Sequence, residues 1–266
     1  MYLSSLEELL LGLLRNADIQ GMRAHLSELP YPDIRPDRST PLLALAAKFS
    51  TSPMIALLLD AGANPNLTDY RWQRSALHYA ADAGQIDGLV LLLQSGADPN
   101  LTSADGKTPL HVAASQPDSK LADCLLEAGA DPMRVDITGH RPALQAVLHG
   151  RATVLARLLD SMAARSARIS DGYGPELHAA ARLGHQAITD MLLRAGADIT
   201  AADTADNQLM HHAVLSGDWR YAMYLLSQGA QHNPVNRAGL QPADLLPEIS
   251  NDQQRQAMAR ALSLVS

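Results

Sequence analysis

An apolar anchor residue recurs along this chain every 33 or 34 residues. The anchors are Leu10, Leu43, Leu77, Leu110, Ala143, Leu177, Met210 and Ala243. The positions 19 residues after the first seven anchors include five glycines, Gly62, Gly96, Gly129, Gly196 and Gly229. A fixed period of this length indicates supersecondary units that bury their apolar faces by stacking on one another. The chain is therefore predicted to form a repeat array rather than a domain around one central core.

The most regular copy runs from Ser103 to Met133. Asp105-Gly106 favours a turn, and Thr108-Pro109 favours a helix cap followed by proline at the first helical position, where its missing N–H is not needed. Two apolar stripes at helical spacing follow, the first formed by Leu110, Ala113 and Ala114 and the second by Leu121, Cys124, Leu125 and Leu126. Gly129 is suited to the left-handed conformation that ends a helix. Each copy should therefore contain a turn, a helix, a tight turn, a second helix and a stop.

The string Thr108-Pro109-Leu110-His111-Val112-Ala113 and the ending Gly129-Ala130-Asp131 resemble the ankyrin repeat. The resemblance covers roughly residues 4–262 and implies an all-α solenoid of stacked helix-loop-helix units with hairpin-like loops. In this register the chain is a single array over residues 1–266. It comprises an N-terminal capping unit at 1–29, internal repeats at 40–66, 74–100, 107–133, 140–166, 174–200 and 207–233, and a C-terminal capping unit at 239–266.

Three segments depart from the regular pattern. The first unit lacks the Thr-Pro start and the stop glycine but keeps an apolar stripe through Leu9, Leu13, Leu14, Met22, Leu26 and Leu29. Residues 30–36 contain three prolines, which favour an extended connector. In the fifth unit Met162 replaces the stop glycine, so its second helix should continue to about residue 166 and break near 170–172. That irregularity represents either a local change in curvature or sequence drift that packing tolerates.

Composition limits the partners that the chain can have. The net charge of −7 comes from 21 basic and 28 acidic residues, and an acidic protein repels a phosphate backbone. The N-terminus carries no Lys or Arg before Arg15, unlike a secretory signal, and no apolar run is long enough to span a membrane. We therefore expect a cytoplasmic monomer that does not bind nucleic acid and does not insert into a membrane. Eighteen arginines against three lysines suggest a GC-rich, bacterial genome.

The residues capable of chemistry are predicted to be structural. The resemblance assigns a structural role both to the stop glycines and to the histidine after each anchor. This histidine is expected to form hydrogen bonds to the backbone and to the hydroxyl of the cap residue. These histidines are His78, His111, His178 and His211. The alternative to a structural role is a zinc site formed by His211, His212 and His232. Zinc needs four ligands, however, and the sequence contains no second thiol. Cys124 lies on a leucine stripe and is expected to be buried and inert. No catalytic motif or phosphate-binding loop occurs in the sequence, so we expect no catalytic residue, metal or cofactor.

Partner contacts in ankyrin arrays come from loop tips and from variable positions on the concave face of the first helices. The corresponding candidates are Phe49, Tyr70, Trp72, Arg74, Asp82, Lys107, Gln116, Leu148, His149, Arg182, Leu183, Leu215 and Trp219. The loop 66–75 is one residue longer than its counterparts, and Trp72 within it is either an interface anchor or a side chain that folds back over its own loop. Phe49, Leu148, Leu183 and Leu215 form either an exposed apolar strip or separate caps of their own helix pairs.

These observations favour a non-catalytic module that binds a protein or peptide, acting as an adaptor, scaffold or inhibitor. A secreted bacterial effector or a toxin-neutralising immunity protein is the alternative. A less favoured alternative to a binding module is an enzyme with a cryptic active site in the groove. Such a site would require clustered carboxylates or histidines with perturbed pKa values.

Overall fold

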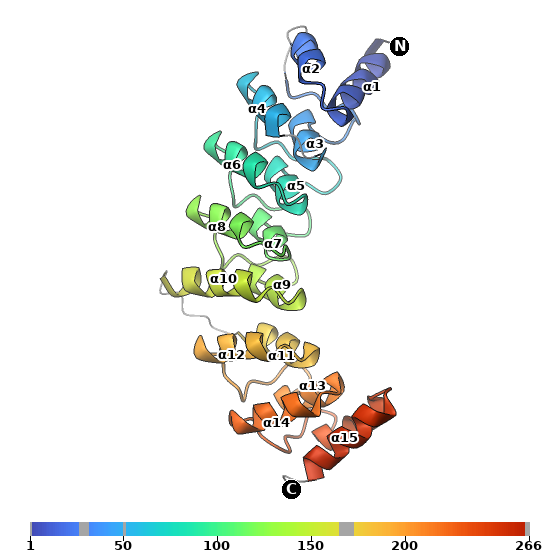
Figure 1. The fold of residues 1–266 in the computed structure, drawn as a ribbon, viewed down its shortest axis with the longest axis vertical. Coiled ribbons are helices and arrows are strands. Elements are labelled where there is room, and N and C mark those ends of the chain that lie inside the picture. Colours follow the sequence, from blue (N-terminus) through green and yellow to red (C-terminus); the bar gives the residue numbers. More distant parts are fainter. Residues whose placement is uncertain (1, 27–31, 50–51, 165–172, 264–266) are drawn as a thin grey trace. The chain divides into compact units, whose positions relative to one another are not determined.

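The computed structural model describes residues 2–26, 32–49, 52–164 and 173–263. These residues form helices that follow one another in pairs, joined by hairpin-like loops (Figure 1). Within the described ranges, extended pairing is limited to an isolated antiparallel bridge between Thr68 and Ser75. The all-α architecture expected from the sequence is confirmed.

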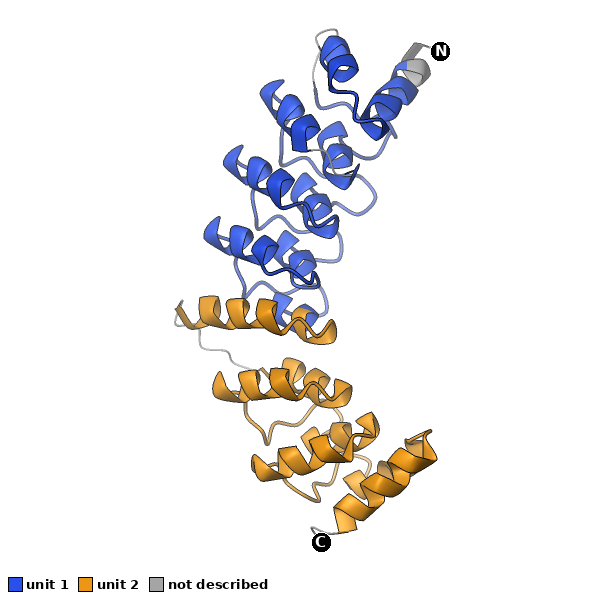
Figure 2. Ribbon diagram, viewed as in Figure 1, with its two compact units in different colours: residues 1–145 blue, residues 146–266 orange. Residues whose placement is uncertain are grey.

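The chain divides into two compact units, residues 1–145 and 146–266 (Figure 2). Unit 1 contains α1 (Tyr2–Arg15), α2 (Ile19–Leu26), α3 (Leu42–Phe49), α4 (Ser52–Asp60), α5 (Ala76–Asp82), α6 (Ile86–Gln94), α7 (Pro109–Ala113) and α8 (Lys120–Glu127). The border between the units falls within α9 (Pro142–Leu148). Unit 2 contains α10 (Ala152–Ala164), α11 (Gly174–Leu183), α12 (Gln186–Arg194), α13 (Leu209–Ser216), α14 (Trp219–Ser227), the 3-10 helix η1 (Pro242–Glu248) and α15 (Asp252–Ser263).

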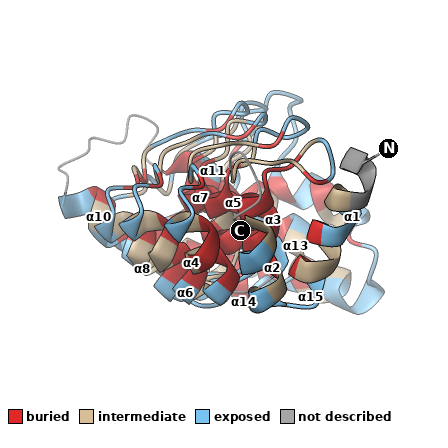
Figure 3. Ribbon diagram, turned by 90° about the horizontal axis from the view of Figure 1, so that it is seen from above, coloured by how far each residue is buried: buried red, intermediate tan, exposed pale blue. Residues whose placement is uncertain are grey.

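Within each unit, helices of successive repeats pack side by side. In unit 1, α5 packs between α3 and α7, and α6 packs between α4 and α8. In unit 2, α13 packs between α11 and η1, α10 packs on α12, and α15 covers α14 and η1. Buried residues gather on the helix sides that face one another, and the loops are more exposed (Figure 3). The core is thus a series of thin layers rather than one centre.

The period of the anchors follows from this layering. The first seven anchors, from Leu10 to Met210, are all buried. The eighth, Ala243, is exposed, and its place in the core is taken by Pro242 and Leu245. The assignment of Ala243 as an anchor was therefore wrong, because the last unit forms a 3-10 helix interrupted by Pro247 instead of an α-helix.

Two other placements predicted from the sequence differ from the structure. Leu9, assigned to the buried stripe of the first unit, is exposed, whereas Leu10 and Leu14 are fully buried. Cys124 is half-buried rather than buried. In both cases the apolar pattern identifies the helix, but it does not define the edge of the helix face that neighbours cover.

The five stop glycines end their helices in the left-handed region, with φ between +83° and +98°. Where Met162 replaces glycine, α10 continues through that buried residue to Ala164. The predicted break at 170–172 lies outside the described residues, as do residues 30 and 31 of the proline-rich connector. The second helix of the fifth unit therefore runs on past the usual stop position, for the reason that the sequence suggested.

Two glycines in unit 1 allow the effect of backbone conformation on stability to be measured without a steric clash. A Cβ added to either Gly12 or Gly129 would have no neighbouring atom within 4 Å, but only Gly129 has a positive φ, +92°. Gly129→Ala should lower the free energy of unfolding by about 1–2 kcal/mol. Gly12→Ala, inside α1, should raise it by about 1 kcal/mol. Urea unfolding of both variants measures this, and changes of the same sign would contradict the cap assignment.

Candidate partner-binding surface

The hairpin loops share one hydrogen-bonded frame. In each, the first residue donates its N–H to the carbonyl of the last at 2.9–3.0 Å, in the pairs Asp69–Arg74, Ser103–Lys107, Asp136–His140, Asp203–Asn207 and Asn236–Leu240. The residue before the last has a positive φ in every case: Gln73, Gly106, Gly139, Asp206 and Gly239. The first pair encloses one residue more than the others. The hairpin at residues 69–74 is therefore the longer loop anticipated from the sequence.

The buried carboxylate of Asp69 holds the 69–74 hairpin in place. Its Oδ1 accepts hydrogen bonds from the N–H groups of Arg71 (2.8 Å) and Trp72 (2.6 Å). Its Oδ2 accepts from the N–H of Arg74 and from the hydroxyl of Tyr79, both at 3.0 Å. Asp69 is only 2% exposed, and these four donors offset the loss of water around its charge. The tip of the hairpin is thus fixed from inside.

Neighbouring hairpins in unit 1 are also bonded to one another. Tyr70 donates its N–H to the carbonyl of Ser39 at 3.2 Å, and the carbonyl of Trp72 accepts from Ala104 at 2.8 Å. The carbonyl of Asp105 accepts in the same way from Ile137 at 3.1 Å. The loops therefore form a continuous backbone ladder that supports the 69–74 hairpin on both sides.

Two aromatic side chains project from this supported hairpin. Tyr70 is 72% exposed and Trp72 is 54% exposed. The guanidinium of Arg35 lies 3.9 Å from the Tyr70 ring centre, and that of Arg71 lies 5.2 Å from the Trp72 ring centre. These contacts fall within the range of cation–π attraction. Trp72 therefore leaves more than half of its surface open to solvent and is not folded back over its loop.

The remaining candidates in unit 1 have partners within the fold. Arg74 pairs with Asp82 at 3.2 Å, and its guanidinium lies 4.9 Å from the Tyr79 ring centre. Gln116 donates to the carbonyl of Asp82 at 3.2 Å, and Lys107 pairs with Asp105 at 3.0 Å. These side chains connect adjacent segments of the array. Phe49, at the end of α3, is partly exposed beside Lys48.

In unit 2, three apolar candidates are partly exposed at helix ends. Leu148 ends α9, Leu183 ends α11 and Leu215 lies one residue before the end of α13. Arg182 and His149 are exposed beside Leu183 and Leu148. Phe49, the fourth member of the proposed apolar strip, belongs to unit 1.

Trp219 is the first residue of α14, and it is partly exposed. The Arg220 guanidinium lies 5.4 Å from its ring centre. Its ring, with Met223 and residues of α15, borders a shallow apolar hollow. Of the tyrosines nearby on α14, Tyr221 is buried and Tyr224 is half-buried.

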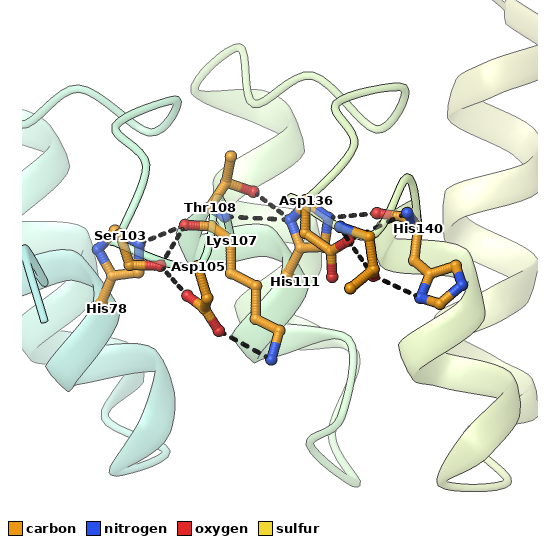
Figure 4. A network of polar contacts seen from close by, with 9 residues as sticks. His78, Ser103, Asp105, Lys107, Thr108, His111, Asp136 and His140 are labelled. Carbon is orange, nitrogen blue, oxygen red and sulfur yellow. Dashed lines mark hydrogen bonds and ion pairs between the residues drawn. The ribbon is translucent and has the colours of Figure 1, made fainter.

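The histidines after the anchors join each repeat to the next. In His111, Nδ1 accepts the N–H of Thr108 at 3.1 Å and lies 2.9 Å from the Thr108 hydroxyl, while Nε2 lies 3.1 Å from the carbonyl of His140 (Figure 4). Because Nδ1 accepts, the neutral ring carries its proton on Nε2 and donates it to that carbonyl. His78 makes the same bonds to Ser75 and to the Lys107 carbonyl. His211 accepts the N–H of Gln208 and reaches the Leu240 carbonyl, but the cap hydroxyl implied by the resemblance is absent because Gln208 has none.

His178 departs from this arrangement. It is buried, but neither ring nitrogen has a hydrogen-bond partner among the described residues. The residue three positions earlier, where Ser75 and Thr108 cap the helices of His78 and His111, is Pro175; it lies inside α11, which Tyr173 caps, and it offers neither an N–H nor a hydroxyl. The ring instead lies 5.1 Å, centre to centre, from that of His212, whose Nε2 is 3.1 Å from Asp203 Oδ2. The hydrogen bonding implied by the resemblance is thus wrong for His178, and Pro175 was the signal that the sequence analysis missed.

This environment makes the pH dependence of stability predictable. Burial, followed by the neighbouring His212, lowers the pKa of His178 to about 4. In the unfolded chain the His178 imidazole binds a proton near pH 6.5, whereas in the folded protein it stays neutral down to about pH 4. The free energy of unfolding therefore falls as the pH drops from 6.5 towards 4. His78, whose pKa burial also lowers to about 4, should act in the same direction.

His178→Leu should therefore remove about 2 kcal/mol of the stability difference between pH 7.5 and pH 5, with little loss at pH 7.5 because no hydrogen bond is broken. The matched variant His111→Leu should lose about 1–3 kcal/mol at pH 7.5, because it leaves the Thr108 cap and the His140 carbonyl unpaired. Urea unfolding at both pH values measures this. A His178→Leu variant with the full wild-type pH dependence would contradict the assignment.

The described residues contain no group of three or more His, Cys, Asp or Glu side chains that could hold a metal ion. The zinc alternative for His211, His212 and His232 therefore finds no support in the geometry. The pKa of the Cys124 thiol is raised by burial and by the nearby Glu127 and Asp123 carboxylates, which disfavours the reactive thiolate. Over the part of the chain that the structure describes, no helix is long and apolar enough to cross a membrane.

Stacked helix pairs joined by hairpins that bond to one another define the class of helical repeat proteins. Within that class, the family model for ankyrin repeats matches three overlapping segments, residues 5–103, 77–171 and 110–203. The chain therefore belongs to the ankyrin repeat family, and the resemblance noted in the sequence is confirmed.

Individual relatives agree with this assignment. The chain is 30% identical over 193 residues to the ankyrin repeat protein nuc-2 of Neurospora crassa, a match that covers 69% of this chain but only 17% of the relative. This relative is fungal and lends no support to the bacterial origin suggested by arginine usage.

Solved structures show the same fold. The ankyrin repeat domain of human ASB11 has a TM-score of 0.72 and 24% identity, covering 84% of this chain and 97% of that one. The ankyrin repeat domain of Bcl-3, described as a unique member of the IkappaB protein family, has a TM-score of 0.69 and 26% identity, covering 82% of this chain and 97% of its own.

Proposed function

We propose that this chain is a non-catalytic protein-interaction module whose main contact is the 69–74 hairpin. The observation that carries the proposal is that Asp69 fixes a hairpin from which Tyr70 and Trp72 project into solvent. Large aromatic side chains on a rigid support bind with little loss of conformational entropy and are frequent hot spots. Ankyrin repeat domains generally bind proteins, and this hairpin supplies a specific place for such binding.

The form of the surface favours a macromolecular partner over a small substrate. Tyr70 and Trp72 stand out from the hairpin, whereas small-molecule sites are concave and bury most of their ligand. We propose that the chain acts as an adaptor, scaffold or inhibitor. Exposed first-helix positions such as Phe49 and Asp82 would extend the contact from the hairpin to the concave face.

Affinity capture with the full chain, followed by mass spectrometry, tests this function. Trp72→Ala should weaken capture of the partner by at least about 2 kcal/mol, roughly thirtyfold, if Trp72 is a hot spot. Its stability should stay within about 0.5 kcal/mol of wild type because the side chain is exposed. Leu110→Ala should instead lower the free energy of unfolding by about 2–5 kcal/mol, because Leu110 is fully buried.

Val135→Ala is a matched control, since Val135 is an exposed apolar residue of the same unit that lies outside the hairpin. It should change neither capture nor stability. Equal destabilisation by Trp72→Ala and Leu110→Ala, or capture that is insensitive to Trp72→Ala, would contradict the proposed role of the hairpin.

A further inference from the structure

We propose that the surface formed by Lys48, Phe49, Tyr70, Arg71 and Trp72, here called the aromatic-cation surface, binds an extended acidic peptide segment of its partner. This inference rests on the proposed interaction function and names the chemistry of the partner. The segment would place carboxylates against Lys48 and Arg71 and apolar side chains on Phe49 and Trp72.

Tyr79 contacts both the end of α3 and the base of the 69–74 hairpin. The Lys48 ammonium lies 5.9 Å from the ring centres of both Phe49 and Tyr79. Tyr79 also lies 4.9 Å, at its ring centre, from the Arg74 guanidinium and donates its hydroxyl to Asp69, which holds the hairpin. Tyr79 itself is buried. The end of α3 and the base of the 69–74 hairpin therefore rest on one shared aromatic ring.

The cations of the surface differ from the basic residues of unit 1 that form ion pairs. Arg74, Lys107 and Arg38 each have a carboxylate within 4 Å. Lys48 and Arg71 are exposed, and among the described residues neither has such a carboxylate; both lie against aromatic rings instead. A cation over a ring keeps its charge and its N–H donors available on the side away from the ring.

The hairpin also lacks a negative charge that would neutralise these cations. Residues 70–74 include no acidic residue, and of their two arginines Arg74 is paired with Asp82 at 3.2 Å, whereas Arg71 forms no ion pair within the part of the chain that the structure describes. The carboxylate of Asp69 is buried and is taken up by four hydrogen-bond donors. In a chain with a net charge of −7, the surface is thus a local positive site with exposed aromatic rings. Charge complementarity favours a partner with local negative charge.

A peptide segment fits this pattern better than a nucleic acid does. Single strands also use aromatic stacking and arginine, but they require a basic groove that follows a continuous phosphate backbone. The acidic chain as a whole would repel such a backbone. An acidic peptide presents only a few charges, at the place where Lys48 and Arg71 can meet them. The fixed hairpin lowers the entropic cost of ordering that contact.

Fluorescence anisotropy with synthetic probes tests the inference on the full chain. The main probe is a fluorescein-labelled dodecapeptide in which glutamate alternates with leucine. Comparison probes replace glutamate with lysine, or leucine with serine, and a further probe is an oligothymidylate of the same length. The glutamate–leucine peptide should bind most tightly, and added salt should weaken its binding because the ion pairs are exposed.

The double variant Lys48→Glu/Arg71→Glu should lose at least tenfold in affinity for this peptide. Arg134→Glu, which reverses an exposed charge of the same unit outside the surface, should bind as wild type does. In a Trp219→Phe background Trp72 is the only tryptophan, so binding of the peptide should also change the tryptophan fluorescence of the protein. Circular dichroism checks that each variant is folded.

Equal binding by wild type and the double variant, or tighter binding of oligothymidylate than of the peptide, would overturn the inference. Its failure is distinguishable from failure of the proposed function. If the natural partner is captured by wild type, lost with Trp72→Ala and retained by the double variant, the hairpin binds a protein but that protein is not recognised through acidic residues.

Discussion

The hydrogen bond from an imidazole in one repeat to a carbonyl in the next hairpin is the interaction on which the rest of the structure depends. It joins residues 29 positions apart, as in His78 with Lys107 and His111 with His140. The same ring caps its own helix through the other nitrogen. One neutral side chain therefore fixes the start of a helix and the position of the following loop, which ties the hairpins of unit 1 into a row.

A surface for binding is built on that row with a small change. One inserted residue lengthens the 69–74 hairpin, and the carboxylate of Asp69 accepts N–H groups from its tip, as Asp136 and Asp203 do in their own hairpins. The core contributes the hydroxyl of the buried Tyr79, which donates to Asp69. The change is confined to one hairpin and its contacts, as expected for a repeat protein in which each unit contacts only its neighbours.

The sequence predicts those features that depend on local chemistry repeated many times. The Thr-Pro cap, the stop glycines and the apolar stripes each specify a local conformation, and their period specifies the stacking. It was less informative where a role depends on what lies opposite in space. Trp72 was identified as a candidate, but the carboxylate that orders its loop was not, because the partners of Asp69 are backbone groups whose directions exist only in the folded hairpin. Likewise, the sequence marks Arg74 as a candidate for partner contacts, but it cannot show that Arg74 pairs with Asp82.

The central claim is that the hairpin bearing Trp72 is ordered before any partner arrives. Amide hydrogen exchange of the free protein measures this directly. The N–H groups of Arg71, Trp72 and Arg74, all bonded to Asp69, should exchange at least about tenfold more slowly than in an unstructured peptide, and Asp69→Ala should abolish that protection. Exchange of these amides in the wild type at the rate of an unstructured peptide would contradict the account.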